Sequence, residues 1–95
     1  MQLLFFATIR GCTGEKETRW NEPADTLGVL LRSLSDRYGP AFRRWVLDNG
    51  DLGKAVLVVV NGADSRHLGG INTPLHPDDT IAIFPMIAGG QGLTC

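Results

Sequence analysis

The residues whose types and spacing could do chemistry lie near the carboxyl end, in the run Pro85-Met86-Ile87-Ala88-Gly89-Gly90. The run is uncharged, and no Asp, Glu, Lys or Arg follows Asp79. Glycine has no Cβ, so its backbone reaches conformations closed to other residues and can approach another surface closely. A segment of this kind predicts a flexible probe that enters the active site of a partner protein.

The other reactive side chains do not form a site of their own. Cys12, Cys95, His67 and His76 do not have metal-ligand spacing, and no CxxC or HExxH motif occurs. The sequence also lacks a Walker loop, a nucleophilic triad and a pair of catalytic carboxylates. It therefore predicts no metal site and no catalytic machinery within this chain.

Composition narrows the class of protein. A chain of 95 residues with 43% hydrophobic residues is expected to form one small globular domain. A net charge of -1 gives no reason to expect nucleic acid or an anionic membrane as partner. No apolar run is long enough to span a bilayer, and the segment 1–9 lacks the features of a signal peptide. We therefore expect a cytoplasmic protein.

One helix dominates the predicted secondary structure. Asp25 or Thr26 can cap its first turn, and Gly39 followed by Pro40 ends it. Apolar residues at helical spacing form a single stripe along it: Leu27, Leu30, Leu31, Leu34 and Tyr38. A second, shorter helix is expected over 41–48.

The rest of the chain favours strands. They are expected at 1–10, 15–20, 54–61, 63–68 and 80–84, the last two separated by loop and the first two joined by a turn. One crossover helix between two hairpins predicts an α+β fold of the β-grasp type. Its mixed sheet would have four to five strands, with the first and last strands parallel neighbours. We expect the domain to span 1–86 and a flexible tail to span 87–95.

Several apolar residues are assigned to the core or to a docking surface. We expect Phe6, Val58, Val60 and Phe84 in the core and Ile87 on the docking surface. The near-continuous apolar first strand predicts burial on both faces, so a partner can cover one exposed face of the sheet.

The chain resembles the MoaD/ThiS family of ubiquitin-like sulfur carriers. The resemblance extends from residue 1 to residue 90, and the helix start at 25–31 fits it. The motifs that carry it are Val60-Asn61-Gly62, Thr73-Pro74-Leu75, Asp78-Asp79-Thr80-Ile81-Ala82-Ile83-Phe84-Pro85 and Ala88-Gly89-Gly90.

The resemblance implies a carrier rather than an enzyme. In this family an ATP- and Mg²⁺-dependent adenylating enzyme activates the terminal glycine carboxylate, and sulfur then replaces AMP to give a thiocarboxylate. Carried over to this sequence, Gly90 is the reacting residue and Gly89 lies beside it. Phe84, Pro85, Met86, Ile87 and Ala88 would contact the partners, and the chain itself would bind no cofactor.

The resemblance also implies partners. One is the adenylating enzyme, which is itself related to ubiquitin-activating enzymes. The other is a sulfur-accepting synthase. In the molybdopterin branch the carrier is the small synthase subunit, which serves the molybdenum or tungsten cofactor. Other branches serve cysteine, methionine or thiamin synthesis, or modify proteins.

Two features depart from the simplest family members. Gly90 is followed by Gln91–Cys95, so its carboxyl group lies in a peptide bond and cannot be adenylated. The carrier interpretation therefore requires removal of 91–95, which in some relatives is done by a JAMM-type zinc peptidase. Pro85-Met86 also replaces the Pro-Pro of many members, which weakens assignment to the molybdopterin branch.

Two alternatives remain open. A ubiquitin-like protein modifier would share the activation step but end in isopeptide bonds to lysine. A non-carrier interaction module would dock through its sheet and never use its carboxyl group.

Overall fold

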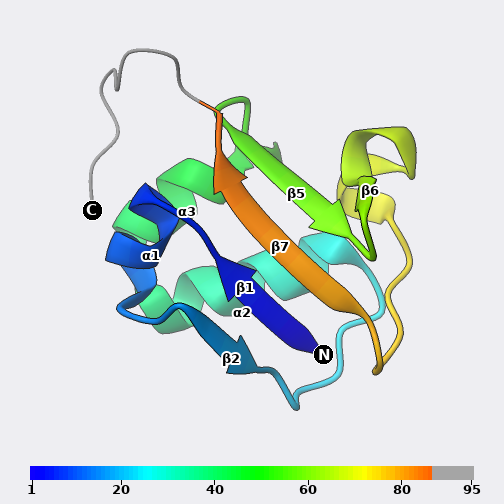
Figure 1. Ribbon diagram of the computed structural model, residues 1–95. Coiled ribbons are helices and arrows are strands. Elements are labelled where there is room, and N and C mark those ends of the chain that lie inside the picture. Colours follow the sequence, from blue (N-terminus) through cyan, green and yellow to red (C-terminus); the bar gives the residue numbers. More distant parts are fainter. Residues whose placement is uncertain (87–95) are drawn as a thin grey trace.

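The computed structural model describes residues 1–86 and shows a mixed sheet with its main helix packed on one side (Figure 1). The helices are α1 (Thr8–Thr13), α2 (Leu27–Tyr38) and α3 (Pro40–Val46), with two 3₁₀ turns, η1 (Ser65–His67) and η2 (Gly70–Asn72). The strands are β1 (Gln2–Phe5), β2 (Glu17–Arg19), β3 (Leu47–Asp48), β4 (Asp51–Leu52), β5 (Val56–Val60), β6 (Ala63–Asp64) and β7 (Thr80–Pro85).

The main sheet has five strands in the order β2-β1-β7-β5-β6. The central strand β7 runs parallel to β1, with Gln2 opposite Thr80 and Phe5 opposite Ile83, and antiparallel to β5. This arrangement confirms the predicted β-grasp fold with parallel first and last strands. It also places the strand that leads to the double glycine in the middle of the sheet.

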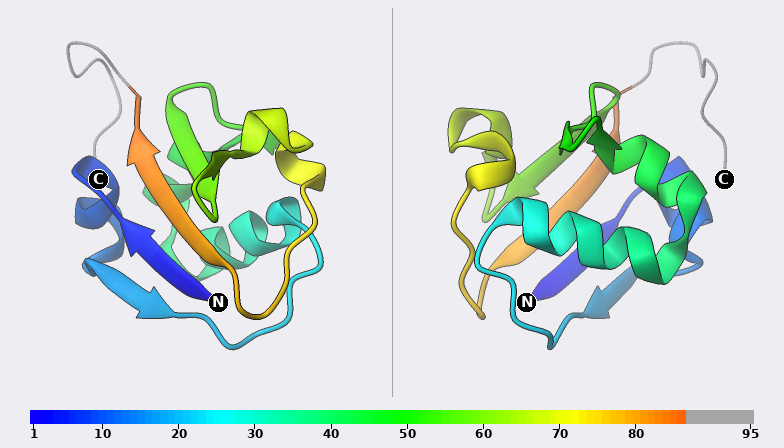
Figure 2. Two further views of the ribbon diagram at one scale, coloured as in Figure 1. Left: turned by 45° about the vertical axis from the view of Figure 1, so that its right-hand side comes forward. Right: turned by 180° about the vertical axis from the view of Figure 1, so that it is seen from behind.

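Helix α2 has the predicted boundaries. The Thr26 side chain accepts a hydrogen bond from the Val29 N–H at its start, and Gly39, with φ of 98°, follows its last residue. The apolar stripe is buried against the sheet at Leu27, Leu30, Leu31 and Leu34. The view from behind in Figure 2 shows α2 lying across the strands.

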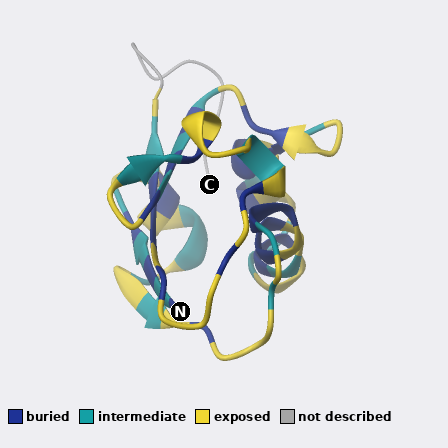
Figure 3. Cartoon of the chain, turned by 90° about the vertical axis from the view of Figure 1, so that its right-hand side faces the viewer, coloured by how far each residue is buried: buried dark blue, intermediate teal, exposed yellow. Residues whose placement is uncertain are grey.

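The core lies between α2, α3 and one face of the sheet (Figure 3). Alternate strand residues point into it and are fully buried: Leu3, Phe5, Val56, Val58, Ile81 and Ile83. Phe5 packs edge-on against Tyr38 and Phe42, with ring centroids 5.7 and 6.3 Å apart. Val58 and Val60 are in the core, as predicted.

Two predicted strands are shorter than expected. Strand β1 ends at Phe5, because the backbone turns at Ala7 and Ile9 and Arg10 belong to α1. Strand β6 ends at Asp64, whose side chain accepts a hydrogen bond from the Arg66 N–H at 2.9 Å and starts η1. In both places a local turn replaces the extended backbone that the residue types favoured.

The region after α2 also differs in detail. Pro40 is the first residue of α3 rather than only a stop after α2, since proline suits a first helical turn. The helix ends at Val46, and the residues after it form a small hairpin of β3 and β4. No helix in the described part of the chain has the length and apolar character needed to cross a membrane.

Candidate docking face and carboxyl-terminal site

Strand β7 is the last described element before the double-glycine segment in the sequence. It lies between β1 and β5, and its Ile81 and Ile83 side chains are fully buried. The Met86 N–H donates a 2.7 Å hydrogen bond to the Ala55 carbonyl, so the ladder continues to this residue. Ile87, Ala88, Gly89 and Gly90, the other predicted site residues, lie outside the described residues 1–86.

The face of the sheet opposite α2 is apolar, and no described helix or strand covers it (Figures 1 and 2). We call this surface the open face; it consists of Leu4, Phe6, Leu57, Val59, Ala82 and Phe84. Five of these side chains are half-buried, and Ala82 is 9% exposed. A contiguous apolar surface of this kind on a small domain marks an interaction site.

The residues of the open face form two rows across the strands. Leu4 and Val59 flank Ala82 in one row, and Leu57 lies opposite Phe84 in the other. Phe6 completes the second row, because its ring stacks on that of Phe84 with centroids 4.3 Å apart and planes at 11°. Phe84 directly precedes Pro85 and Met86, so the open face extends to the last of the described residues.

The expectation that Phe6 and Phe84 lie in the core is therefore wrong. Side chains alternate along β7, and Ile83 takes the core-facing position, which leaves Phe84 on the opposite face. Phe84 is half-buried there, Pro85 is half-buried beside it, and Met86 is 56% exposed. Phe84 and Met86 are therefore available to a partner that covers the open face, whereas Pro85 lies opposite the buried Val56 on the covered side.

Phe6 is held in place by an unusual turn. Ala7 has φ of 52° and ψ of -126°, and the Ile9 N–H donates a 3.1 Å hydrogen bond to the Phe6 carbonyl. This is a type II′ turn, in which the residue with positive φ is normally glycine. Alanine in this conformation is strained, and strain of this kind persists where the surroundings fix the backbone.

The motif residues at the other end of the sheet have a structural role. Asn61, with φ of 51°, donates its side-chain N–H to Asp79 at 2.8 Å and accepts from the Thr80 N–H at 2.9 Å. Asp79 also accepts from the backbone N–H of His76 at 2.8 Å. This network joins the β5–β6 turn to the start of β7, which explains why Val60-Asn61-Gly62 and Asp79-Thr80 occur together.

Asp79 is a buried carboxylate, 8% exposed. Burial alone would raise its pKa, but the hydrogen bonds from Asn61 and from the His76 N–H outweigh that effect and lower the pKa below the usual value. Asp79 is thus ionised in the native protein and acts as a hydrogen-bond acceptor that stabilises the fold.

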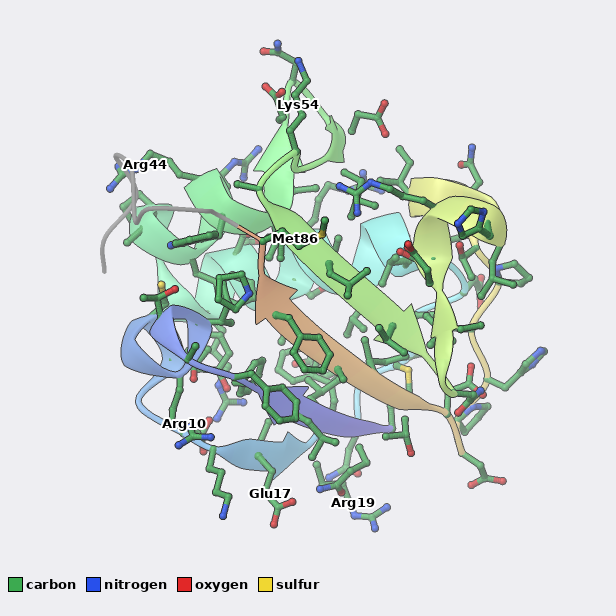
Figure 4. All side chains as sticks on the ribbon, turned by 45° about the horizontal axis from the view of Figure 1, so that its top comes forward. Arg10, Glu17, Arg19, Arg44, Lys54 and Met86 are labelled. Atoms are coloured by element: carbon green, nitrogen blue, oxygen red, sulfur yellow. The ribbon has the colours of Figure 1, made fainter. Side chains whose placement is uncertain are left out.

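A hollow of about 380 Å³ lies beside Ala55, next to the end of β7. Its lining includes Ala55, which bonds to Met86, and two exposed cations, Arg44 and Lys54 (Figure 4). Lys54 Nζ is 3.6 Å from a carboxylate oxygen of Asp48, and both side chains are exposed, so the ion pair is weak. The two cations are available to a partner that binds next to the tail.

Within residues 1–86 no three His, Cys, Asp or Glu side chains are grouped as metal ligands. Tyr38, the single tyrosine of the sequence, has its pKa raised to about 12 by burial and by the Glu15 carboxylate that accepts its 2.6 Å hydrogen bond. Neither feature supplies a reactive group near the tail.

The fold and the open face define a ubiquitin-like carrier or modifier, and comparison with known proteins supports this class. The chain belongs to the ThiS family, whose model matches residues 3–90. It is similar to small archaeal modifier protein 3 of Haloferax volcanii, with 37% identity over 95% of this chain and 98% of the relative. It is thus a relative of small carrier and modifier proteins and not an enzyme.

Two further relatives show the range of the family. Sulfur carrier protein CysO of Mycobacterium tuberculosis is 34% identical over 70% of this chain and 73% of its own length. The solution structure of small archaeal modifier protein 1 from Methanosarcina acetivorans superposes with a TM-score of 0.79 at 30% identity, covering 94% of each chain. CysO is named a sulfur carrier, and the other two relatives are named modifier proteins. The relatives of this chain therefore include both kinds of protein.

Sequence reasoning missed most of the open face. Leu4, Leu57 and Val59 were not identified as individual contact residues, although the unbroken apolar runs around them carry the information. A half-solvated strand alternates apolar with polar residues, whereas β5 reads Val-Leu-Val-Val-Val. The absence of that alternation in β5 predicts that both faces of the strand are buried, one of them against a partner.

Proposed function

We propose that this chain is a sulfur carrier that acts through the carboxyl group of Gly90 after residues 91–95 are removed. The observation that carries the proposal is an uncovered apolar face on β7, the strand that precedes the Gly89-Gly90 segment in the sequence. The family match supports it further, because the match ends at residue 90 and leaves the last five residues outside.

The proposed reaction has three steps. A peptidase of the JAMM type hydrolyses the Gly90–Gln91 peptide bond and frees the Gly90 carboxylate. An adenylating partner that binds ATP and Mg²⁺ joins this carboxylate to AMP and releases pyrophosphate. A sulfur nucleophile then displaces AMP, which leaves a thiocarboxylate for transfer to a synthase in the cytoplasm.

The structure supports a specific role for the described residues in these steps. Phe6, Phe84 and the rest of the open face would bind the partner, and Pro85 and Met86 would direct the chain away from the sheet. A carboxylate reacts only when its carbonyl is held next to the activating group, so docking and alignment are the contribution this chain makes. Arg44 and Lys54 would add charge contacts beside the tail.

The pathway that accepts the sulfur is a separate part of the proposal. Molybdopterin, cysteine, methionine and thiamin pathways all use carriers of this type. The relation to CysO, a named sulfur carrier, supports a carrier role, whereas Pro85-Met86 argues against the molybdopterin branch.

A protein modifier is the second candidate, favoured by the relative named small archaeal modifier protein 3, which matches nearly the whole chain. Here the activated Gly90 carbonyl would be attacked by a lysine amine instead of a sulfur nucleophile, with the same loss of AMP.

The test begins with intact-mass measurement of the full chain after incubation in lysate of the source organism. We expect a product that ends at Gly90, and a product that ends elsewhere would count against processing. A chain truncated at Gly90 is then given ATP and the organism's adenylating enzyme with a sulfur donor. A carrier gains the mass of an oxygen-to-sulfur exchange, whereas a modifier gives isopeptide-linked products. A Gly90-truncated Phe84→Ala variant is the matched control for docking.

A further inference from the structure

The two edges of the main sheet differ in how they are protected. Strand β6 is only two residues long and continues directly into η1, which packs next to β5. At the opposite edge, β2 has no neighbouring strand on its outer side among the described elements (Figure 1). An unpaired edge presents backbone donors and acceptors to any other strand that can reach it.

The hydrogen bonds of β2 identify which backbone groups face outward. The Trp20 N–H donates to the Met1 carbonyl at 2.8 Å, and the Phe5 N–H donates to the Lys16 carbonyl at 2.9 Å. Because bonded positions alternate along an antiparallel ladder, Thr18 also faces β1. The N–H and C=O groups of Glu17 and Arg19 therefore point away from the sheet.

Glu17 and Arg19 also place opposite charges along this edge. They lie opposite Leu4 and Gln2, so both side chains are on the open-face side, and both are exposed. The Gln2 side chain donates to the Glu17 carboxylate at 3.2 Å, whereas Arg19 has no ion pair within residues 1–86. Figure 4 shows both side chains extending outward from β2.

We propose that β2 pairs antiparallel with β2 of a second copy of this chain, about a two-fold axis at Thr18. In this register Glu17 of one copy lies opposite Arg19 of the other, and the reverse pair forms at the other side of the axis. Each such pair exchanges both backbone hydrogen bonds, because these are the residues whose N–H and C=O groups face outward. Opposite charges in directly opposing positions stabilise the pairing.

The charge pattern selects this register over its neighbours. Only residues whose N–H and C=O groups point outward can form the new hydrogen bonds. The alternative registers therefore differ from this one by two residues. One such shift places Glu17 opposite Glu17, and the other places Arg19 opposite Arg19. Each shift thus puts a destabilising like-charge pair at the axis, and Glu15, which would face Arg19 in the first shift, lies outside β2 and already accepts a hydrogen bond from Tyr38, so the register centred on Thr18 is favoured.

The resulting dimer is a single continuous sheet with both open faces on the same side. A two-fold axis perpendicular to the sheet keeps each open face accessible. The pairing thus leaves partner docking unobstructed. Since the edge is short, self-association is weak and becomes visible only at high protein concentration.

The test uses the full chain in reducing buffer, measured by sedimentation equilibrium and by NMR over a dilution series. We expect concentration-dependent dimerisation, with the backbone amides of Glu17 and Arg19 shifting most. The Arg19→Glu and Glu17→Arg variants should each dimerise about tenfold more weakly, because each makes both opposing pairs repulsive. The double variant Glu17→Arg/Arg19→Glu should recover dimerisation, and an equimolar mixture of the two single variants should form a heterodimer.

Arg32→Glu is the matched control, since it makes the same change in net charge on an exposed position of α2 and should dimerise like the unmodified chain. Circular dichroism of each variant establishes that it is folded. A chain that stays monomeric throughout the dilution series would overturn the proposal. Dimerisation that is unaffected by Arg19→Glu, or that is lost in Phe84→Ala, would overturn it too, because the second result would place the contact on the open face.

Discussion

The covered face and the open face of the sheet are made by the same three strands, β1, β5 and β7. On the covered face Leu3, Phe5, Val58 and Ile83 are fully buried against the helices. On the open face Leu4, Phe6, Val59 and Phe84 are equally apolar yet only half-buried.

The two faces have the same types of residue but differ in what covers them. The covered face is stabilised by this chain's own helices, so its residues contribute to folding. The open face lacks such a layer, and its apolar area is available for burial against another protein. Substitutions on the two faces should therefore separate stability from partner binding.

The largest effect is expected from Phe5→Ala on the covered face. Phe5 is fully buried and packs against Tyr38 and Phe42, so its loss leaves a cavity in the core. The free energy of unfolding should fall by about 3–5 kcal/mol, as measured by urea denaturation. A fall of under about 1 kcal/mol would mean that the covered face does not hold the fold together.

A second prediction concerns the pH dependence of stability that Asp79 contributes. Its carboxylate joins the β5–β6 turn to the start of β7. Its pKa is lower in the folded than in the unfolded chain, so the unfolded chain binds protons more readily. The stabilisation is complete above the unfolded pKa of about 3.9 and is lost as the pH falls through the folded pKa. Urea midpoints measured from about pH 6 to about pH 3 should show this loss.

Asp79→Asn is the control for that titration. The amide does not ionise and provides one acceptor oxygen where the carboxylate provides two, so the variant should be less stable at neutral pH. Its urea midpoint should also vary less in acid. An identical acid profile in the two proteins would assign the pH dependence to other carboxylates.

Phe84→Ala should have a smaller effect on folding, about 1 kcal/mol, because the ring is half-buried and loses mainly its stacking on Phe6. Its effect on activation should be larger. With the Gly90-truncated chain and the adenylating enzyme, we expect KM to rise about tenfold, in keeping with loss of an aromatic anchor. If Phe84→Ala lost as much stability as Phe5→Ala and left KM unchanged, the two faces would not differ in function.

The smallest effect is expected from Ala7→Gly, at the turn that follows Phe6. Glycine adopts positive φ without strain, so the variant should gain about 0.5–1 kcal/mol of stability despite the greater freedom of its unfolded chain. Thermal denaturation measures the gain. A lower melting temperature would show that the alanine methyl group makes contacts that outweigh the backbone strain.

Much of the fold could be predicted from residue patterns alone. The stripe from Leu27 to Leu34, with Thr26 before it and Gly39 after it, specifies α2 by local rules of spacing and capping. The Val56–Val60 run specifies β5 in the same way, and Asn61-Gly62 specifies the turn with positive φ. These signals are local, so they do not depend on what the rest of the chain does.

The errors share a different physical origin. Phe6 and Phe84 were assigned to the core by their hydrophobicity, but their face is decided by strand register and by where the helices lie. The end of β1 depends on Ala7, a residue type that rarely adopts positive φ, so no residue preference indicated the turn. Both features are set by tertiary contacts, which a single sequence does not display.

The central position of β7 has a consequence for how the protein is made. Strands β1 and β5 leave the ribosome first, yet each pairs with β7, which is synthesised after them. Strands β1 and β5 can pair early with β2 and β6, but the edge of each that faces β7 stays open until residues 80–85 are synthesised, a delay that exposes the nascent chain to aggregation. Since Gly89-Gly90, the proposed reacting segment, is translated shortly after β7, it becomes available only when the main sheet can be completed.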